Sequence, residues 1–162
     1  MNRLKYCHAS DSFVLLFACG QASSQVIVRV NDAKPVKLDA NNLAELPRQV
    51  AVLKDHGKQI NYEGVLLHDV FARNGVDFGK GLRGNQLSSY VVAIGTDGYQ
   101  VVYSLADFDP SITNSAIILA DERDGKPLDA KEGPFRIVVP NDKRPARSVR
   151  LLKEIDVVQL KK

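Results

Sequence analysis

The residue types best suited to chemistry gather near the C-terminus, in a short segment rich in arginine and lysine. A β-branched run that ends in a proline leads into this segment, which holds Lys143, Arg144, Arg147, Ser148 and Arg150. Arginine and lysine supply charge-assisted hydrogen-bond donors to phosphate and carboxylate groups. The segment therefore predicts an anion-binding loop, with a solvated basic turn as the alternative.

His56 is a second candidate, because a histidine next to Asp55 could act as a metal ligand or as a proton donor. A metal site needs three or four convergent ligands, and no second histidine stands at a metal-ligand spacing from His56. The alternative, an exposed histidine in the turn before Gly57, is therefore the preferred interpretation.

Tyr99 is a third candidate, because it follows Asp97 and Gly98 at an expected hairpin turn. Residues two apart on a strand share a face, so Tyr99 and Tyr103 are expected on the same side of the sheet. Tyr99 could hydrogen-bond a ligand there. The alternative is that both tyrosines pack against the sheet with their hydroxyls at its edge.

Six short motifs in a fixed order resemble those of the molybdopterin-binding oxidoreductase domain family, which has the sulfite-oxidase-like fold. The resemblance runs from about residue 26 to residue 160, and each motif is weak when taken alone. The motifs are Leu43–Pro47, Tyr62–Phe71, Asp97–Tyr99, Asp124–Leu128, Gly133–Pro140 and Arg147–Arg150.

The resemblance implies an α+β fold with mixed β-sheets and short helices. It also implies that Arg147, Ser148 and Arg150 match the step that contacts the phosphate side of the pterin. With Arg144, His56 and Tyr99, these residues form the expected cofactor-binding set, and molybdopterin is the possible cofactor.

The chain departs from the family at the position that makes its members molybdenum enzymes. Catalytic members place a cysteine thiolate after the first core strand, and a soft thiolate suits molybdenum better than carboxylate or imidazole does. Residues 50–58 contain no cysteine here, and the two cysteines of the chain are Cys7 and Cys19. The family's aromatic loop is also replaced, by Asn141–Pro145. We therefore expect neither molybdenum catalysis of the usual kind nor a firmly held cofactor.

Three functions remain open at this stage, and whether the protein is an enzyme stays undecided. The favoured one is an exported ligand-binding or accessory domain that takes an anionic small molecule or a pterin. The second is an oxidoreductase that binds molybdopterin through Arg147–Arg150 with atypical metal coordination. The third is a module that binds a periplasmic partner protein through its sheet edges and the loop 79–86.

Composition narrows the class of protein. At 162 residues with 44% hydrophobic residues, the chain is long enough for one domain with a substantial core. A net charge of +3 and aromatics that do not alternate with the cations argue against nucleic-acid binding. No run of apolar residues is long enough for a membrane span.

The N-terminus has the character of a bacterial export signal. A basic start with Arg3 and Lys5 precedes the apolar run 13–18, and small residues follow. We expect residues 1–22 to form a signal peptide cleaved after Ala22, and residues 23–162 to form a single domain in the periplasm or outside the cell. A lipid anchor at Cys19 and a wrongly assigned start codon are the alternatives.

The remaining sequence predicts short strands and few helices. Alternating or β-branched runs predict strands at 26–30, 36–38, 49–53, 59–62, 90–94, 100–103, 117–120 and 133–140, with an apolar closing segment at 151–160. Asp39 is expected to cap a short helix that ends at Leu46, and apolar spacing predicts a second helix from Leu67 that stops at Asn74. Residues 79–86 are expected to form an exposed loop.

Overall fold

The structure, a computed structural model, describes residues 25–160, so the expected signal peptide and both cysteines lie outside the described residues. Its elements, in chain order, are β1 (Val26–Val30), β2 (Val36–Leu38), α1 (Ala40–Ala44), β3 (Arg48–Asp55), β4 (Lys58–Leu66), α2 (Leu67–Arg73), η1 (Gly79–Gly81), η2 (Gly84–Ser88), β5 (Tyr90–Gly95), β6 (Gln100–Ser104), η3 (Leu105–Phe108), β7 (Ile118–Arg123), β8 (Lys126–Pro127), β9 (Arg136–Val138), η4 (Pro145–Arg147) and β10 (Leu152–Val158), where η marks a 3-10 helix.

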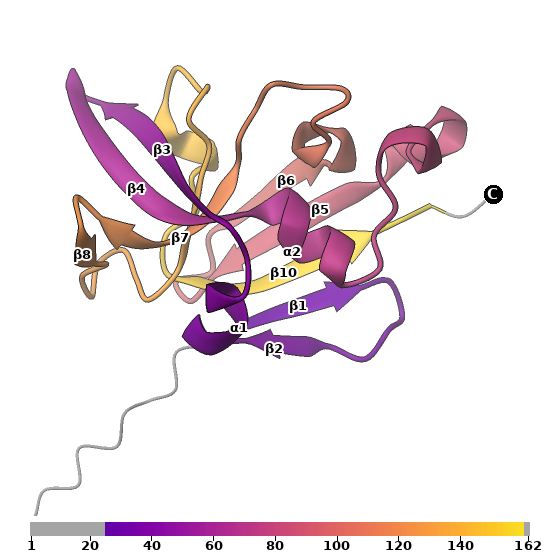
Figure 1. Ribbon diagram of the computed structural model, residues 1–162, viewed down its shortest axis with the longest axis horizontal. Helices are drawn as coiled ribbons and strands as arrows, with labels where there is room; N and C mark the ends of the chain where they lie inside the picture. The colour runs from indigo at the N-terminus through magenta and orange to yellow at the C-terminus, as the bar shows by residue number, and fades with distance from the viewer. Residues whose placement is uncertain (1–24, 161–162) are drawn as a thin grey trace, which may run out of the picture.

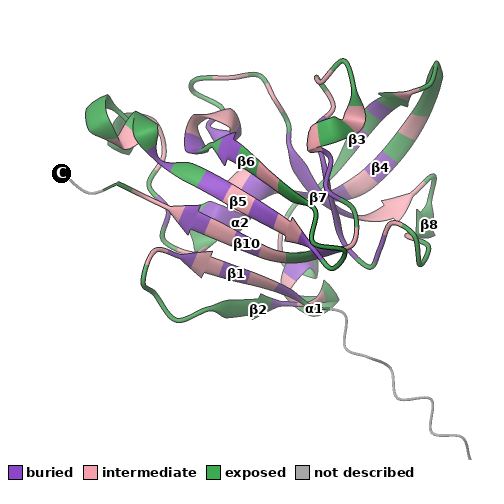
Figure 2. Ribbon diagram, turned by 180° about the vertical axis from the view of Figure 1, so that it is seen from behind, coloured by how far each residue is buried: buried purple, intermediate pink, exposed green. Residues whose placement is uncertain are grey.

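The strands form two sheets. The first has the order β2-β1-β10-β5-β6, and only the β1–β10 pair in it is parallel. Helices α1 and α2 lie on one face of this sheet (Figure 1). In Figure 2 the opposite face turns toward the viewer and no helix covers it. The predicted α+β class with a mixed sheet is confirmed.

The second sheet has the order β3-β4-β7-β8, with β9 also paired to β7, and all its pairs are antiparallel. Its longest part is the β3–β4 hairpin, which projects from the body of the protein (Figure 1). The hairpin turn is His56-Gly57, and both residues have positive φ, 46° and 78°. Two successive residues with positive φ give the turn type whose twist matches a two-residue hairpin. His56 is thereby held at the hairpin tip.

Strands β4 and β7 approach each other closely at Gly64. A Cβ built on Gly64 would lie 2.0 Å from the carbonyl oxygen of Leu119, and the pairing register shifts between Glu63 and Gly64. A side chain at this position would push the two strands apart. The glycine of the Tyr62–Phe71 motif is therefore required by the pairing of β4 with β7.

Two apolar clusters hold the sheets together. The larger one packs the inner face of the first sheet against α2, with Phe71, Leu105 and Ile155 fully buried. The smaller one lies on the second sheet and includes Leu53, Tyr62 and Val138. Both clusters are built from β-branched, aromatic and leucine side chains at alternate strand positions, as a half-buried sheet requires.

Most of the predicted elements are present, with small differences at their ends. Asp39 caps α1 as expected: its Oδ1 accepts from the Asn42 N–H at 3.0 Å, and the Asn42 side chain accepts from the Asp39 N–H at 3.0 Å. The helix ends at Ala44, two residues before the predicted Leu46. Helix α2 ends at Arg73 and is capped by Asn74, as predicted.

Two predictions about irregular segments need correction. Residues 79–86, predicted to form an exposed loop, are mostly exposed, but they contain η1 and the start of η2, and Leu82 is 3% exposed and packed into the larger cluster. The expected strand 133–140 is shorter than predicted, since only β9 pairs with a neighbour, over residues 136–138. Among residues 25–160 no helix has the length and apolar character that crossing a membrane would need.

Asp109 anchors the η1 segment from the interior. The residue is 1% exposed, and its carboxylate accepts from Gly79 N at 2.6 Å, Ser111 N at 2.8 Å and Ser111 Oγ at 2.7 Å. Burial by itself raises the pKa of Asp109, but the hydrogen bonds from Ser111 and Gly79, with His68 nearby, outweigh it and lower the pKa below its usual value. A lowered folded-state pKa means that the charged carboxylate stabilises the fold above about pH 4, and that this stability is lost as the pH falls through the folded pKa.

We predict that Asp109→Asn lowers the free energy of unfolding at neutral pH by about 2 kcal/mol, because an amide NH₂ would face one of the three buried donors. The difference between the variant and the original protein should shrink in acid, where Asp109 itself becomes protonated. Urea unfolding at neutral and acidic pH measures both effects. Asp32→Asn, at an exposed turn position, is the matched control and should change stability by about 0.5 kcal/mol at most. Equal losses in the two variants would contradict this role of Asp109.

Candidate functional site

One large cavity of about 690 Å³ lies between the tip of the β3–β4 hairpin, the β5–β6 turn and the segment 143–150. Its lining is rich in charge, with six basic side chains against three acidic ones, an excess of three positive charges. The basic residues are Lys54, Arg123, Arg136, Lys143, Arg144 and Arg150. We call this cavity the basic pocket.

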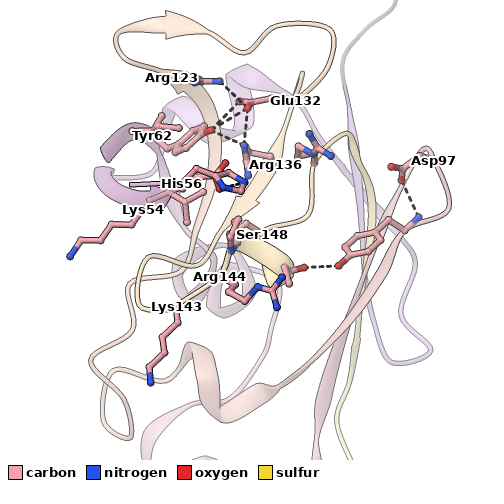
Figure 3. Close-up of a pocket in the computed structure, with 17 residues that line it drawn as sticks. Lys54, His56, Tyr62, Asp97, Arg123, Glu132, Arg136, Lys143, Arg144 and Ser148 are labelled. Atoms are coloured by element: carbon pink, nitrogen blue, oxygen red, sulfur yellow. Dashed lines mark hydrogen bonds and ion pairs between the residues drawn. The ribbon is translucent and has the colours of Figure 1, made fainter. Parts of the chain in front are cut away.

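The floor of the basic pocket is a network around Arg136 (Figure 3). Arg136 is 4% exposed, and its guanidinium lies over the Tyr62 ring at 4.5 Å from the ring centre. Its NH1 donates to the Tyr62 hydroxyl at 2.7 Å and pairs with Glu132 Oε1 at 3.2 Å. Arg123 pairs with the same carboxylate oxygen at 3.0 Å. One carboxylate therefore faces two guanidinium groups.

The Tyr62 hydroxyl completes this network. It donates to Glu132, at 3.3 Å from Oε1 and 3.2 Å from Oε2. Burial raises the pKa of Tyr62, so the hydroxyl keeps its proton and remains a donor at neutral pH. The Nε of Arg136 is buried without a hydrogen-bond partner in the described part of the chain. A buried donor of this kind is uncommon.

The rim of the basic pocket carries four cations that have no carboxylate partner in the part of the chain that the structure describes. Within residues 25–160, Lys54, Lys143, Arg144 and Arg150 make no ion pair or side-chain hydrogen bond, although all four line the pocket. By contrast, Arg29, Arg48, Arg73 and Arg147 are each paired with carboxylates. Unpaired cations around one cavity create a positive field that attracts anions.

The structure brings five of the six predicted site residues together. Arg144, Ser148, Arg150, His56 and Tyr99 all line the basic pocket. Ser148 is 6% exposed, and its Oγ accepts from the Val139 N–H at 3.0 Å, so it anchors the loop to β9. The His56 side chain is 95% exposed at the hairpin tip, 3.6 Å from Asp55. The part these residues play in binding a cofactor stays a prediction.

Arg147, the sixth predicted residue, does not line the pocket. Its guanidinium is bound by Asp142 through Nε at 2.9 Å and NH2 at 2.7 Å, and by Asp107 through NH1 at 3.0 Å. The hydrogen bonds that Arg147 donates to the Asp142 carboxylate are the main cause that raises the pKa of Arg147. The Tyr103 hydroxyl donates to the Arg147 carbonyl, and burial raises the pKa of Tyr103. Arg147 therefore shapes the loop and has no free donor fork to offer a ligand.

Sequence reasoning missed most of the pocket floor. Arg136 lies on β9, pairs with Glu132 and also lines the pocket. Nothing in the sequence indicated that Glu132 and Arg123 belong to the pocket, because both stand in turn-rich sequence outside the basic segment. Tyr62 and Arg136 do belong to two of the recognised motifs, and that was the available clue.

Glu132→Gln should lower the free energy of unfolding by about 3 kcal/mol, because it leaves the buried Arg136 charge uncompensated. Urea unfolding at neutral pH measures the loss. Glu45→Gln is the control: Glu45 also pairs with an arginine, Arg73, but both side chains are about half exposed, and such pairs contribute about 1 kcal/mol or less. A loss for Glu132→Gln no larger than for Glu45→Gln would show that the network does not stabilise the floor.

Comparison with known proteins identifies a family and a similar solved structure. The sequence profile of the oxidoreductase molybdopterin binding domain matches residues 22–162. Among solved structures, the sulfane dehydrogenase SoxCD from Paracoccus pantotrophus is similar, with a TM-score of 0.63 and 16% sequence identity. The likeness covers 83% of this chain and 38% of that chain, and at this identity it establishes the fold alone. No curated protein is similar enough in sequence to count as a relative.

Proposed function

The chain belongs to the oxidoreductase molybdopterin binding domain family, and from that premise we propose that it is an exported ligand-binding or accessory domain. Its basic pocket holds the phosphate-bearing end of a pterin, or a comparable small anion, and it does not perform thiolate-ligated molybdenum catalysis. The observation that carries this proposal is the set of four unpaired cations around one pocket whose floor contains a buried arginine.

The donor set of the pocket fits a phosphate group. Arg144 and Arg150 present guanidinium groups, which bind phosphate oxygens through paired, charge-assisted hydrogen bonds. Lys54 and Lys143 add point charges near the opening. At the floor, the buried Arg136 adds positive charge beneath these groups. These residues would hold the anionic end of the ligand and orient it in the pocket.

The same lining does not fit the metal half of a molybdopterin cofactor. No cysteine stands in residues 25–160, and that range contains no group of three or more histidine, cysteine, aspartate or glutamate side chains able to hold a metal ion. At the end of β3, where the family's thiolate is expected, the pocket is lined by Leu53, Lys54, Asp55 and His56. An ammonium group and an exposed imidazole offer no soft anionic ligand. The proposal therefore includes no step at a metal.

Replacing Arg150 by alanine should weaken the binding of inorganic pyrophosphate by roughly tenfold, because one charge-assisted contact is lost. Isothermal titration calorimetry at low salt measures this. The affinity of the original protein should also fall as sodium chloride is added, since exposed cations are screened by salt.

An arginine outside the pocket provides the control. Arg83→Ala removes an exposed charge that has no partner in residues 25–160, and it should leave pyrophosphate affinity nearly unchanged. If Arg83→Ala weakens binding as much as Arg150→Ala, the attraction depends on total charge and not on the basic pocket.

One sample can test both the cleavage of the signal peptide and the absence of molybdenum. Native mass spectrometry of protein purified from the periplasm of molybdenum-replete cells should give a chain that starts at Ser23, without molybdenum. A chain that keeps residues 1–22 would contradict cleavage after Ala22. Stoichiometric molybdenum would contradict the metal-free function and support an oxidoreductase with atypical coordination.

A further inference from the structure

Strand β3 forms an unpartnered edge of the second sheet. Among residues 25–160 its eight residues pair with β4 alone, and no backbone hydrogen bond joins its other side to another segment. Proteins commonly protect such an edge with a proline, a bulge or charged side chains. Residues 49–53 contain no proline and no charge, and their pairing with β4 has no register shift. Alternate backbone N–H and C=O groups of β3 are therefore open to pair with another extended chain.

The two faces of this edge differ in character. Val50 and Val52 point to the outer face, where they are 63% and 39% exposed. Leu53 points to the inner face, where it lies opposite Ile60 and lines the basic pocket. A segment paired with β3 would place alternate side chains on these two faces. Its outer side chains would meet the valines, and its inner side chains would face the pocket.

The basic pocket extends round the free edge of β3. Its lining includes Lys54, which alternates to the outer face, as well as Leu53 on the inner face. On β4, by contrast, only the inner-face residues Ile60 and Tyr62 line the pocket. A cavity that touches both faces of β3 but one face of β4 is open at the β3 edge. An added strand would therefore run into the cavity, whose rim carries the four cations that lack a carboxylate partner in the described part of the chain.

The charges decide which kind of chain fits this edge. Carboxylates at the inner positions of an added strand would meet the cations of the pocket, so the two surfaces would be complementary. A second copy of this chain is a poorer match. The register that sets Val50 of one copy opposite Val52 of the other also sets two cations opposite each other, Lys54 and Arg48. Like charges that lie directly opposite destabilise a strand pair.

We propose that β3 is a docking edge for an extended segment of a partner protein in which apolar and acidic residues alternate. The segment pairs with β3 as a further strand of the second sheet. Its apolar side chains cover Val50 and Val52, and its carboxylates reach the cations of the basic pocket. The inference goes beyond the proposed function, because it assigns a macromolecular partner to a separate surface and shares with that function only the cations.

Isothermal titration calorimetry with a short synthetic peptide tests the docking edge. The probe is an eight-residue peptide with blocked ends in which valine and glutamate alternate, and the protein is the full chain purified from the periplasm. The same peptide with lysine in place of glutamate should bind about tenfold more weakly, because its charges would oppose those of the pocket. Equal affinities for the two peptides would overturn the inference.

Methylated forms of the probe separate strand pairing from charge attraction. Two peptides of the same sequence carry backbone N-methyl groups on the odd or on the even residues, so each keeps every carboxylate. Only one edge of the peptide can face β3, so one methylated peptide should bind about tenfold more weakly and the other should keep most of its affinity. If both bind as tightly as the unmodified probe, charge alone holds the peptide and β3 is not a docking edge.

A pair of double variants tests the outer face of β3. Val50→Asn with Val52→Asn should weaken binding of the probe by roughly fivefold, because two cross-strand apolar contacts are lost. The matched control is Val36→Asn with Val102→Asn on β2 and β6, the edge strands of the first sheet, where these valines are 42% and 63% exposed. The control should leave the affinity unchanged, and thermal unfolding checks that both variants are folded. Equal losses in the two would show that the peptide does not recognise β3.

Pyrophosphate distinguishes a failure of this inference from a failure of the proposed function. It should compete with the peptide for the cations and weaken peptide binding. If pyrophosphate binds and the peptide does not, the docking edge is wrong and the anion-binding function stands. If the peptide binds and pyrophosphate does not, the reverse holds. A protein dimer that Val50→Asn with Val52→Asn dissociates, without any peptide binding, would assign the edge to a second copy and overturn the inference.

Discussion

The architecture of the pocket depends on one buried positive charge, that of Arg136. A guanidinium taken out of water is tolerated only when hydrogen bonds and an opposite charge compensate it. Here the compensation comes from separate parts of the second sheet: Tyr62 on β4, Glu132 in the loop before β9, and Arg123 at the end of β7 as the partner that fixes Glu132. Satisfying one charge therefore joins three strands and forms the floor of the site.

The basic segment divides its arginines between two tasks. Arg147 turns to Asp107 and Asp142 and fixes the course of the loop, while Arg144 and Arg150 remain unpaired within residues 25–160. Ser148 ties the same loop to β9, and Tyr99 ties it to the β5–β6 turn. The loop is thus held by contacts that do not involve Arg144 or Arg150, so these two cations keep their positions without acidic partners among residues 25–160.

Local structure could be predicted from the sequence where local interactions decide it. The Asp39 cap, the end of α2 at Asn74 and the hairpin turn at Gly98 depend on neighbours within a few residues, and the residue types show this directly. Of the five lining residues, Tyr99, Ser148 and Arg150 stand in motifs of the family resemblance, whereas Arg144 and His56 were chosen for their residue types and their neighbours. The floor could not be predicted, because Glu132 meets Tyr62 across 70 positions of the chain. The pairing of Arg147 with Asp107, 40 positions away, was hidden for the same reason.

The parallel pairing of β1 with β10 sets the order in which this protein can be assembled. β10 is a central strand, flanked by β1 on one side and β5 on the other, and Arg29 meets Asp156 across 127 positions. During translation the first sheet stays split in two until residues 152–158 have been made, with the facing edges of β1 and β5 open. Long-range pairing of this kind slows folding, and open edges invite association between chains. The first sheet of a nascent chain therefore stays incomplete until late in synthesis, whereas the strands of the second sheet, all within residues 48–138, are made earlier.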